Sequence, residues 1–279
     1  MKKIMLFLIA FLLFACNPKT TKKEEPAFSY VYLSGADSLT FLYNFRRGEA
    51  IAKYDKKVAR ATDLLLSQVV PDKEKYQYYI YSDHDDSEKV YFGKLYNETF
   101  EINYIVTFRA NETVYSTPET PVTDQYISKL AHAVDLFFDV NEEELWKYNF
   151  RYNFVVIRGG GDSVIVYGTP GFANNKIYMC GGIKTAFSYT TGDLISNQLL
   201  HLSPIGFTYP SEATTITRTS SKNHIINELD IAQSLINIEF FKHQLIDTGK
   251  YIFVFKYSTN NFGFSYTIIK PPETLQFMH

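Results

Sequence analysis

The sequence predicts an α+β fold, mostly antiparallel β-sheet with about three α-helices. The chain contains 22 Tyr and 23 Phe among 279 residues, and aromatic side chains favour strands. Short Gly-containing turns such as TPGF and TTGD separate many of the apolar runs, which is typical of strands that follow one another in antiparallel sheets. Few segments have the helical period, so too few helices are available to connect parallel strands.

The front of the chain is expected to place one helix among strands. Residues 28–33, FSYVYL, alternate like a strand, and a second apolar stretch covers about 39–45. Residues 47–68 are expected to form a helix, because apolar side chains repeat along one face, and Pro71 ends it. The strands expected next cover residues 76–81, 89–92 and 99–109.

The back of the chain is expected to begin with a second helix. Residues 122–139 have the helical period, and Thr123 and Asp124 are placed to cap its start. A third helix is expected over about 227–241. The strands expected around it cover residues 153–157, 163–167, 176–189, 194–202, 251–257 and 264–269.

Residues 1–15 have the order of an export signal. Lys2 and Lys3 precede an uncharged run that continues to Ala15, which matches the basic and apolar regions of a signal peptide. The run is shorter than the ~20 apolar residues that a transmembrane helix needs. We therefore expect this segment to be removed on export.

The tetrad Leu13-Phe14-Ala15-Cys16 resembles the lipobox of bacterial lipoproteins, in which a small residue precedes a cysteine that is lipidated and becomes the new N-terminus. The resemblance covers the signal region only. It implies that Cys16 carries acyl chains such as palmitate, which form a stable membrane anchor when several are attached. The other reading is a plain secretory signal with an incidental cysteine, but its A-x-A-like cleavage site would need a small residue where Leu13 stands.

Residues 16–27 are expected to be a flexible linker between the lipid and the globular part, because NPKTTKKEEP has no large apolar side chain to bury. The block Lys22-Lys23-Glu24-Glu25 loosely resembles the charged export signals that follow the cysteine in surface lipoproteins of Bacteroidota. This resemblance implies an exported protein of the outer membrane that faces outward. An ordinary charged linker is the alternative.

Residues 28–279 are long enough to bury a core without disulfides. The only cysteine besides Cys16 is Cys180, which a lipidated Cys16 cannot pair with. One globular α+β domain is expected, with a sub-boundary near residue 142 compatible with the helix positions. The formal charge is −2, and removal of Lys2 and Lys3 makes it −4, which argues against nucleic acid as a partner.

Two polar clusters are better explained as turns than as ligand sites. Gly159-Gly160-Gly161-Asp162 leads into a predicted strand, whereas phosphate-binding loops lead into a helix. The segment Asp83-His84-Asp85-Asp86-Ser87-Glu88 could supply oxygen ligands for Ca²⁺, but it lacks the Gly of an EF-hand loop and joins two strands.

His224 and Glu228 lie four residues apart at the start of the third predicted helix, and Asp230 follows. Together they form a speculative metal site, since this spacing places His and Glu on one face. The simpler reading is that Glu228 and Asp230 favour the helix N-terminus electrostatically. We expect no cofactor.

The spacing of Thr217-Arg218-Thr219, Asn227 and Asp230 weakly resembles the core of JAMM-type zinc metalloproteases, in which His-x-His on a strand and a later Asp on a helix bind zinc. Threonines replace both histidines, and a hydroxyl is a poor zinc ligand. The resemblance therefore implies a degenerate, non-catalytic member at most.

No catalytic residue is assigned from the sequence. Cys180 is flanked by apolar strand residues and is expected to be a buried small side chain. His132 and His201 lie at apolar positions, where structural histidines are the default.

The leading hypothesis is a lipid-anchored cell-envelope protein that binds or assembles with a partner, such as another envelope protein, without catalysis. The first alternative is a metal-dependent hydrolase that uses Asp230, His224 and Glu228, or a degenerate JAMM-like pseudoenzyme. The second alternative is the binding of surface glycans. Trp146 is the only Trp, and its exposure beside other aromatic residues would favour glycan binding.

Overall fold

The computed structural model describes residues 29–68, 77–84, 87–110, 112–148, 151–171, 173, 175–201, 203–208, 215–219, 225–241, 243–258 and 263–270. Cys16, the linker predicted over residues 16–27 and His224 lie outside these ranges. The described residues contain four helices and mostly antiparallel sheets, which confirms the predicted α+β class. No helix among them is long and apolar enough to cross a membrane.

Two antiparallel sheets contain most strands between residues 78 and 199. The first has the order β2-β3-β4-β5, with β6 paired to β4, and consists of β2 (Tyr78–Ser82), β3 (Glu88–Tyr96), β4 (Thr99–Phe108), β5 (Thr113–Ser116) and β6 (Val122–Thr123). The second has the order β11-β10-β8-β7 and consists of β7 (Tyr152–Arg158), β8 (Ser163–Pro170), β10 (Ile183–Ser188) and β11 (Leu194–Leu199).

The remaining strands form a pair and a larger sheet. The pair consists of β9 (Lys176–Cys180) and β12 (Pro204–Thr208). The larger sheet has the order β1-β16-β15-β14-β13, and consists of β1 (Ser29–Tyr30), β13 (Thr215–Thr219), β14 (His243–Asp247), β15 (Ile252–Ser258) and β16 (Gly263–Lys270). Among the described strands, β13 and β14 are the only parallel neighbours.

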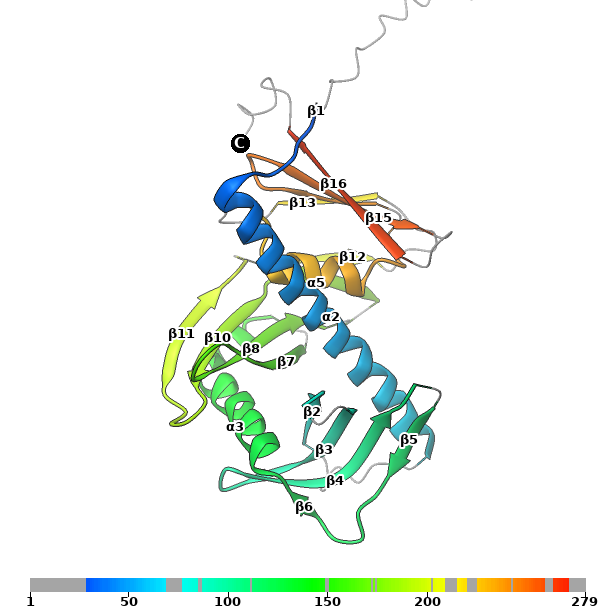
Figure 1. Ribbon diagram of the computed structural model, residues 1–279, viewed down its shortest axis with the longest axis vertical. Coiled ribbons are helices and arrows are strands. Elements are labelled where there is room, and N and C mark those ends of the chain that lie inside the picture. Colours follow the sequence, from blue (N-terminus) through cyan, green and yellow to red (C-terminus); the bar gives the residue numbers. More distant parts are fainter. Residues whose placement is uncertain are drawn as a thin grey trace, which may run out of the picture.

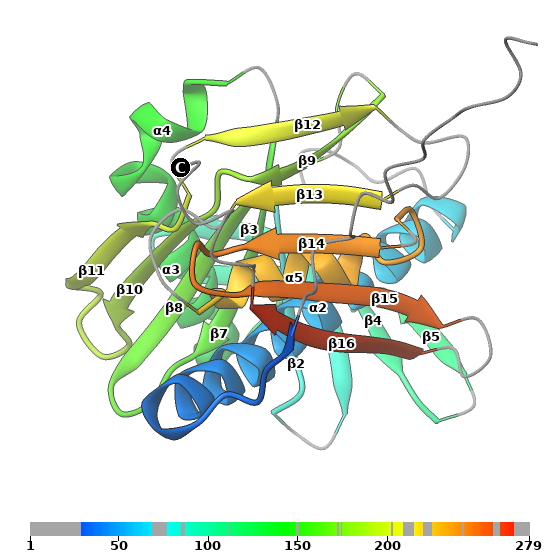
Figure 2. The ribbon, with the colours of Figure 1, turned by 90° about the horizontal axis from the view of Figure 1, so that it is seen from above.

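The helices are α2 (Gly35–Gln68), α3 (Gln125–Val140), α4 (Glu142–Trp146) and α5 (Glu228–Ile236). Figure 1 shows α2 running along the molecule, from the end that holds β1 and β16 to the sheet formed by β2–β5. In Figure 2 the sheet of β13–β16 lies over α5 and α2. The largest core cluster contains residues from both sides of residue 142, among them Tyr54, Phe92, Phe137, Phe154 and Leu229.

Several predicted elements have different bounds in the structure. Residues 39–45 are helical rather than extended, because α2 already begins at Gly35. Buried residues recur with a helical period through this stretch, at Phe41, Asn44 and Gly48. The sequence of a short apolar run does not by itself distinguish a helix from a strand. Helix α5 ends at Ile236 and not at residue 241.

The single strand predicted over residues 176–189 is two strands. Cys180 and Gly181 have φ angles of +63° and +65°, and this left-handed backbone ends β9 before β10 begins at Ile183. The Asp124 cap is confirmed, since its Oδ1 accepts the N–H of Ile127 at 2.9 Å. Helix α3 begins at Gln125, after the short strand β6.

Helices α2 and α5 cross in close contact. A Cβ atom at Gly48 would lie 2.6 Å from Ile231 Cγ2 and 2.9 Å from the carbonyl oxygen of Glu228, so only glycine fits between the two backbones. One turn earlier, Asn44 Nδ2 donates to the carbonyl oxygen of Ile226 at 2.8 Å. The start of α5 is thereby fixed against the middle of α2.

The crossing predicts the effect of Gly48→Ala. Alanine has the higher helix propensity, yet the added methyl group overpacks the contact, so we expect a loss of about 1–3 kcal/mol in the free energy of unfolding. Urea unfolding measures this difference. Gly160→Ala is the control, because a Cβ there meets nothing within 4 Å. Equal stability of the two variants would contradict the prediction.

Candidate functional site

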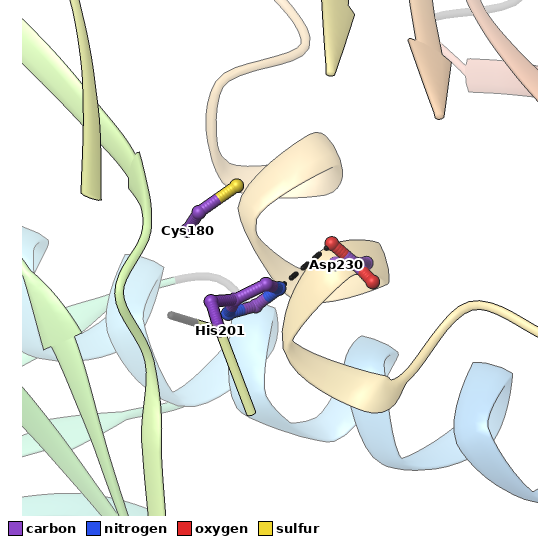
Figure 3. A group of neighbouring side chains, drawn as sticks. All are labelled: Cys180, His201 and Asp230. Atoms are coloured by element: carbon purple, nitrogen blue, oxygen red, sulfur yellow. Dashed lines mark hydrogen bonds and ion pairs between the residues drawn. The ribbon is translucent and has the colours of Figure 1, made fainter. Parts of the chain in front are cut away.

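Three side chains with potential metal-binding or nucleophilic groups meet in the interior. Cys180 lies at the end of β9, His201 follows β11, and Asp230 lies in the first turn of α5 (Figure 3). One sulfur, nitrogen or oxygen ligand atom from each of these side chains lies within 4.8 Å of the other two. Their exposed fractions are 2%, 3% and 0% respectively. The cluster is closed to solvent.

Hydrogen bonds use both ring nitrogens of His201. Its Nδ1 accepts the N–H of Gly182 at 3.3 Å, so the ring proton is assigned to Nε2. Nε2 lies 3.0 Å from Asp230 Oδ1 and donates to it. The other carboxylate oxygen of Asp230 accepts the N–H of Asn227 at 3.3 Å.

This hydrogen-bond arrangement favours a structural role for the cluster. A metal ion on Nε2 would displace its proton and require one on Nδ1, where a backbone N–H already points. A Cys-His nucleophile pair would need a ring nitrogen directed at the thiol and a path for substrate. The geometry fits neither requirement. It fits a buried carboxylate whose charge is stabilised by N–H donors.

Helix α5 also holds the backbone of Cys180. Gln233 Oε1 accepts the N–H of Cys180 at 2.8 Å, and Gln233 Nε2 donates to the Cys180 carbonyl oxygen at 3.4 Å. These bonds fix the left-handed conformation at which β9 ends. Cys180 is buried, as the sequence predicts, and the fold places His201 beside it, a neighbour for which no local sequence pattern gives a signal.

The speculative metal ligands from the sequence have different partners. Glu228 Oε1 accepts from Lys184 Nζ at 2.5 Å and from Tyr167 Oη at 3.2 Å. Asp230 bonds His201 instead. His224 lies outside the described residues, so the trio of His224, Glu228 and Asp230 is not brought together in the part of the chain that the structure describes.

The residues of the JAMM-like spacing have capping and surface positions. Asn227 caps α5, since its Oδ1 accepts the N–H of Asp230 at 2.9 Å, and Asp230 completes the capping box. Thr217 is exposed on β13. Arg218 and Thr219 belong to the same strand. Asp230 thus acts as a cap and as a partner of His201.

Trp146 forms the wall of a surface hollow. Its exposed fraction is 81%, and the hollow beside it measures about 400 Å³. Phe138 and Tyr152 add aromatic surface, and the charged side chains that complete the lining are Asp139, Glu142 and Arg151. A large exposed ring beside further aromatic and charged groups is typical of a binding site.

The junction between α3 and α4 positions Trp146. Asn141, only 3% exposed, donates from Nδ2 to the Phe137 carbonyl oxygen at 2.9 Å and to Thr185 Oγ1 at 3.0 Å. Its Oδ1 accepts from Asn197 Nδ2 at 2.9 Å. The two bonds to Thr185 and Asn197 fix the start of α4 against β10 and β11, and α4 carries Trp146 at its end.

The polar groups of this hollow differ in whether they have a hydrogen-bond or ion-pair partner among the described residues. The Tyr152 hydroxyl donates to the Gly181 carbonyl oxygen at 3.2 Å, and burial raises the pKa of Tyr152 to about 12, so the hydroxyl stays protonated. Among the described residues, the side chains of Asp139, Glu142 and Arg151 make no hydrogen bond or ion pair with one another or with the rest. Within the described part of the chain, these three side chains have no partner that would compete with a ligand.

A second hollow, of about 420 Å³, lies between the start of α3 and the turn that follows β10. Its charged groups already have partners. Lys129 Nζ donates to the Tyr189 carbonyl oxygen at 3.1 Å, and His132 Nε2 lies 4.0 Å from Glu98 Oε1. Asp124 caps α3. This hollow therefore offers fewer unused groups than the one beside Trp146.

A third hollow, of about 310 Å³, contains the carboxyl group of Asp55 among mainly apolar residues such as Ile177, Ile236 and Phe240. Burial raises the pKa of Asp55 from its ordinary value of 3.8 to about 6. The charged form is therefore unfavourable in the folded protein.

No protein family, no curated protein and no solved structure matches this chain. Its function is therefore inferred from the geometry of its own residues.

The buried cluster predicts a large effect of Asp230→Ala. The substitution leaves the N–H groups of His201 and Asn227 without their acceptor, so we expect a loss of about 3–5 kcal/mol in the free energy of unfolding. Chemical unfolding measures the loss, with Asp139→Ala, an exposed acidic residue, as the control. Metal analysis of both proteins is the second readout, and a stoichiometric metal lost only from Asp230→Ala would contradict the structural role.

The Asp55 hollow predicts a pH-dependent effect of Asp55→Asn. The pKa of Asp55 is higher in the folded protein than in the unfolded chain. The native protein therefore loses stability as the pH rises from about 4 through 6. We expect the variant to exceed the native protein by roughly 1–2 kcal/mol at pH 7 and to gain little at pH 4. Unfolding at both pH values tests this. Glu49→Gln, exposed on the same helix, is the control, and an equal gain at both pH values would refute the prediction.

Proposed function

We propose that this chain is a lipid-anchored cell-envelope protein that binds a saccharide in the hollow beside Trp146. The lipobox-like residues Leu13-Phe14-Ala15-Cys16 support export and attachment to a membrane through Cys16. The charged residues that follow support a place on the outer membrane, facing outward. Saccharides are the ligands that such a surface meets.

The exposed ring of Trp146 carries the saccharide assignment. An indole of which 81% is exposed leaves a flat apolar face in water, and the C–H face of a pyranose covers such a surface well. Asp139, Glu142 and Arg151 in the same lining are planar groups that accept from or donate to hydroxyl groups. A volume of about 400 Å³ lies within the range of small-ligand sites.

The described side chains outside this hollow favour binding over catalysis as the function. Among the described residues, Cys180, His201 and Asp230 form the one group of three His, Cys, Asp or Glu side chains close enough to bind a metal ion together, and the group is buried. Hydrolysis by Asp230, Glu228 and His224 has less support, because Glu228 and Asp230 each bond partners inside the fold. An envelope protein that presents an acidic or aromatic segment to the hollow is the alternative ligand.

Trp146→Ala is expected to remove saccharide binding without lowering the melting temperature. Stacking residues at the centre of a binding site are worth about 2 kcal/mol or more, which corresponds to a loss of more than about tenfold in affinity. Because Trp146 is the only Trp, its fluorescence reports the site directly. The measurement is isothermal titration calorimetry of the native protein and of Trp146→Ala with malto-, cello-, xylo- and chito-oligosaccharides, and acrylamide quenching of Trp146 in the native protein is a second readout.

The matched control is Tyr96→Ala, which removes an exposed aromatic ring, 46% accessible, from the end of β3. It should bind as the native protein does. Equal affinity of native protein and Trp146→Ala would refute the site. Protection of Trp146 by a co-purified envelope protein, and by none of the saccharides, would move the assignment to the alternative ligand.

A further inference from the structure

An apolar surface surrounds the point at which the chain enters the fold. It consists of the exposed side chains Tyr30, Tyr32, Leu39, Leu42, Tyr43 and Tyr266, called here the entry surface. Tyr32 is 96%, Tyr30 78% and Leu39 71% exposed. Contiguous apolar side chains in water mark a place where something else is bound.

Three segments build this surface. Strand β1 pairs with the end of β16, with Tyr30 opposite Ile269, and the first turns of α2 lie beside them at one end of the molecule (Figure 1). A groove of about 460 Å³ runs among them and is lined by Tyr30, Tyr32, Leu42 and Tyr266. The surface is therefore concave in part and belongs to the folded domain.

We propose that the entry surface lies on the lipid bilayer that holds Cys16, so that the domain is docked on the membrane as well as tethered to it. This inference rests on the lipid anchor of the proposed function. Residues 17–28 separate Cys16 from β1, and a chain of that length spans at most about 43 Å. The entry surface is the first part of the fold that the tether reaches.

The side chains suit the interface between lipid and water. Tyrosine has an apolar ring and a polar hydroxyl, and it is enriched at the headgroup level of membranes. Leu39 and Leu42 supply aliphatic surface for the acyl boundary. An interface of this chemistry is less suited to a purely polar partner.

The charges around the entry surface agree with an anionic bilayer. The charge of Asp37, in the first turn of α2, is neutralised by Lys250 Nζ at 2.9 Å, and its carboxylate also accepts a hydrogen bond from the Tyr251 hydroxyl at 3.2 Å. Arg46, exposed one turn beyond Leu42, extends the same helical face. Exposed basic side chains near a bilayer are attracted to anionic headgroups.

Helix α2 provides a measure of distance from the membrane. Leu42 and Leu66 are both exposed, 47% and 59%, and lie near opposite ends of this helix. A rise of 1.5 Å per residue places them about 36 Å apart along its axis. Docking by the entry surface brings Leu42 to the bilayer and leaves Leu66 in water.

The test uses the full acylated chain, reconstituted in vesicles of phosphatidylethanolamine and phosphatidylglycerol. A nitroxide is attached at Leu42→Cys or, as the matched control, at Leu66→Cys. Cys180 is only 2% exposed, so the label attaches selectively. Oxygen, which partitions into lipid, and a water-soluble nickel chelate are the two relaxing agents.

Docking predicts that the ratio of oxygen to nickel accessibility is at least several-fold higher at residue 42 than at residue 66. The substitution of Tyr30 and Tyr32 by Ser should lower the ratio at residue 42 and leave that at residue 66 unchanged. Equal ratios at both sites overturn the docking inference. Shielding of residue 42 from both agents overturns it too, because a protein then covers the surface.

Mass spectrometry of the N-terminal peptide from the same sample distinguishes a failure of the lipid anchor from a failure of docking. Acylated Cys16 with a water-exposed residue 42 refutes docking and leaves the anchor standing. An unmodified Cys16, with membrane association unchanged in Cys16→Ser, refutes the anchor and the docking that rests on it. Acylated Cys16 with a lipid-exposed residue 42 supports both.

Discussion

The buried carboxylate of Asp230, in the first turn of helix α5, sets the arrangement of the segments around it. Asp230 has no exposed surface, and an unpaired charge in that position would cost several kcal/mol. The N–H groups of His201 and Asn227 donate hydrogen bonds to it. Gln233, which lies on the same helix, accepts the backbone N–H of Cys180 at the end of β9. The loop after β11 and the end of β9 are therefore fixed by one short helix.

Helix α2 connects α5 to the two ends of the molecule. Its contact with α5 at Gly48 leaves no room for a side chain, so the two helices behave as one packed unit. Residues of α2 then contribute to separate core clusters, Phe41 to one and Tyr54 to another. The segment that carries the entry surface is thus rigidly connected to the sheet at the far end (Figure 1).

The two proposed binding surfaces use side chains that this core leaves uncovered. Trp146 is held at the end of α4 by the buried Asn141, so its exposed ring has a fixed place beside Tyr152. The entry surface combines Tyr and Leu side chains from β1, from the segment between β1 and α2, and from α2 and β16. One is a small hollow lined by charged and aromatic side chains, suited to a polar ligand, and the other is a wider apolar surface, suited to lipid.

The sequence by itself determined the local features: the α+β class, the cap at Asp124 and the burial of Cys180, because alternation, capping and hydrophobicity act between near neighbours. Only the tertiary structure decided that residues 39–45 are helical, since their apolar run acquires a face only against the distant β15–β16 sheet and α5. It also decided that His201 meets Asp230 and that Trp146 stays exposed. These outcomes depend on contacts between remote segments, for which no local pattern carries a signal.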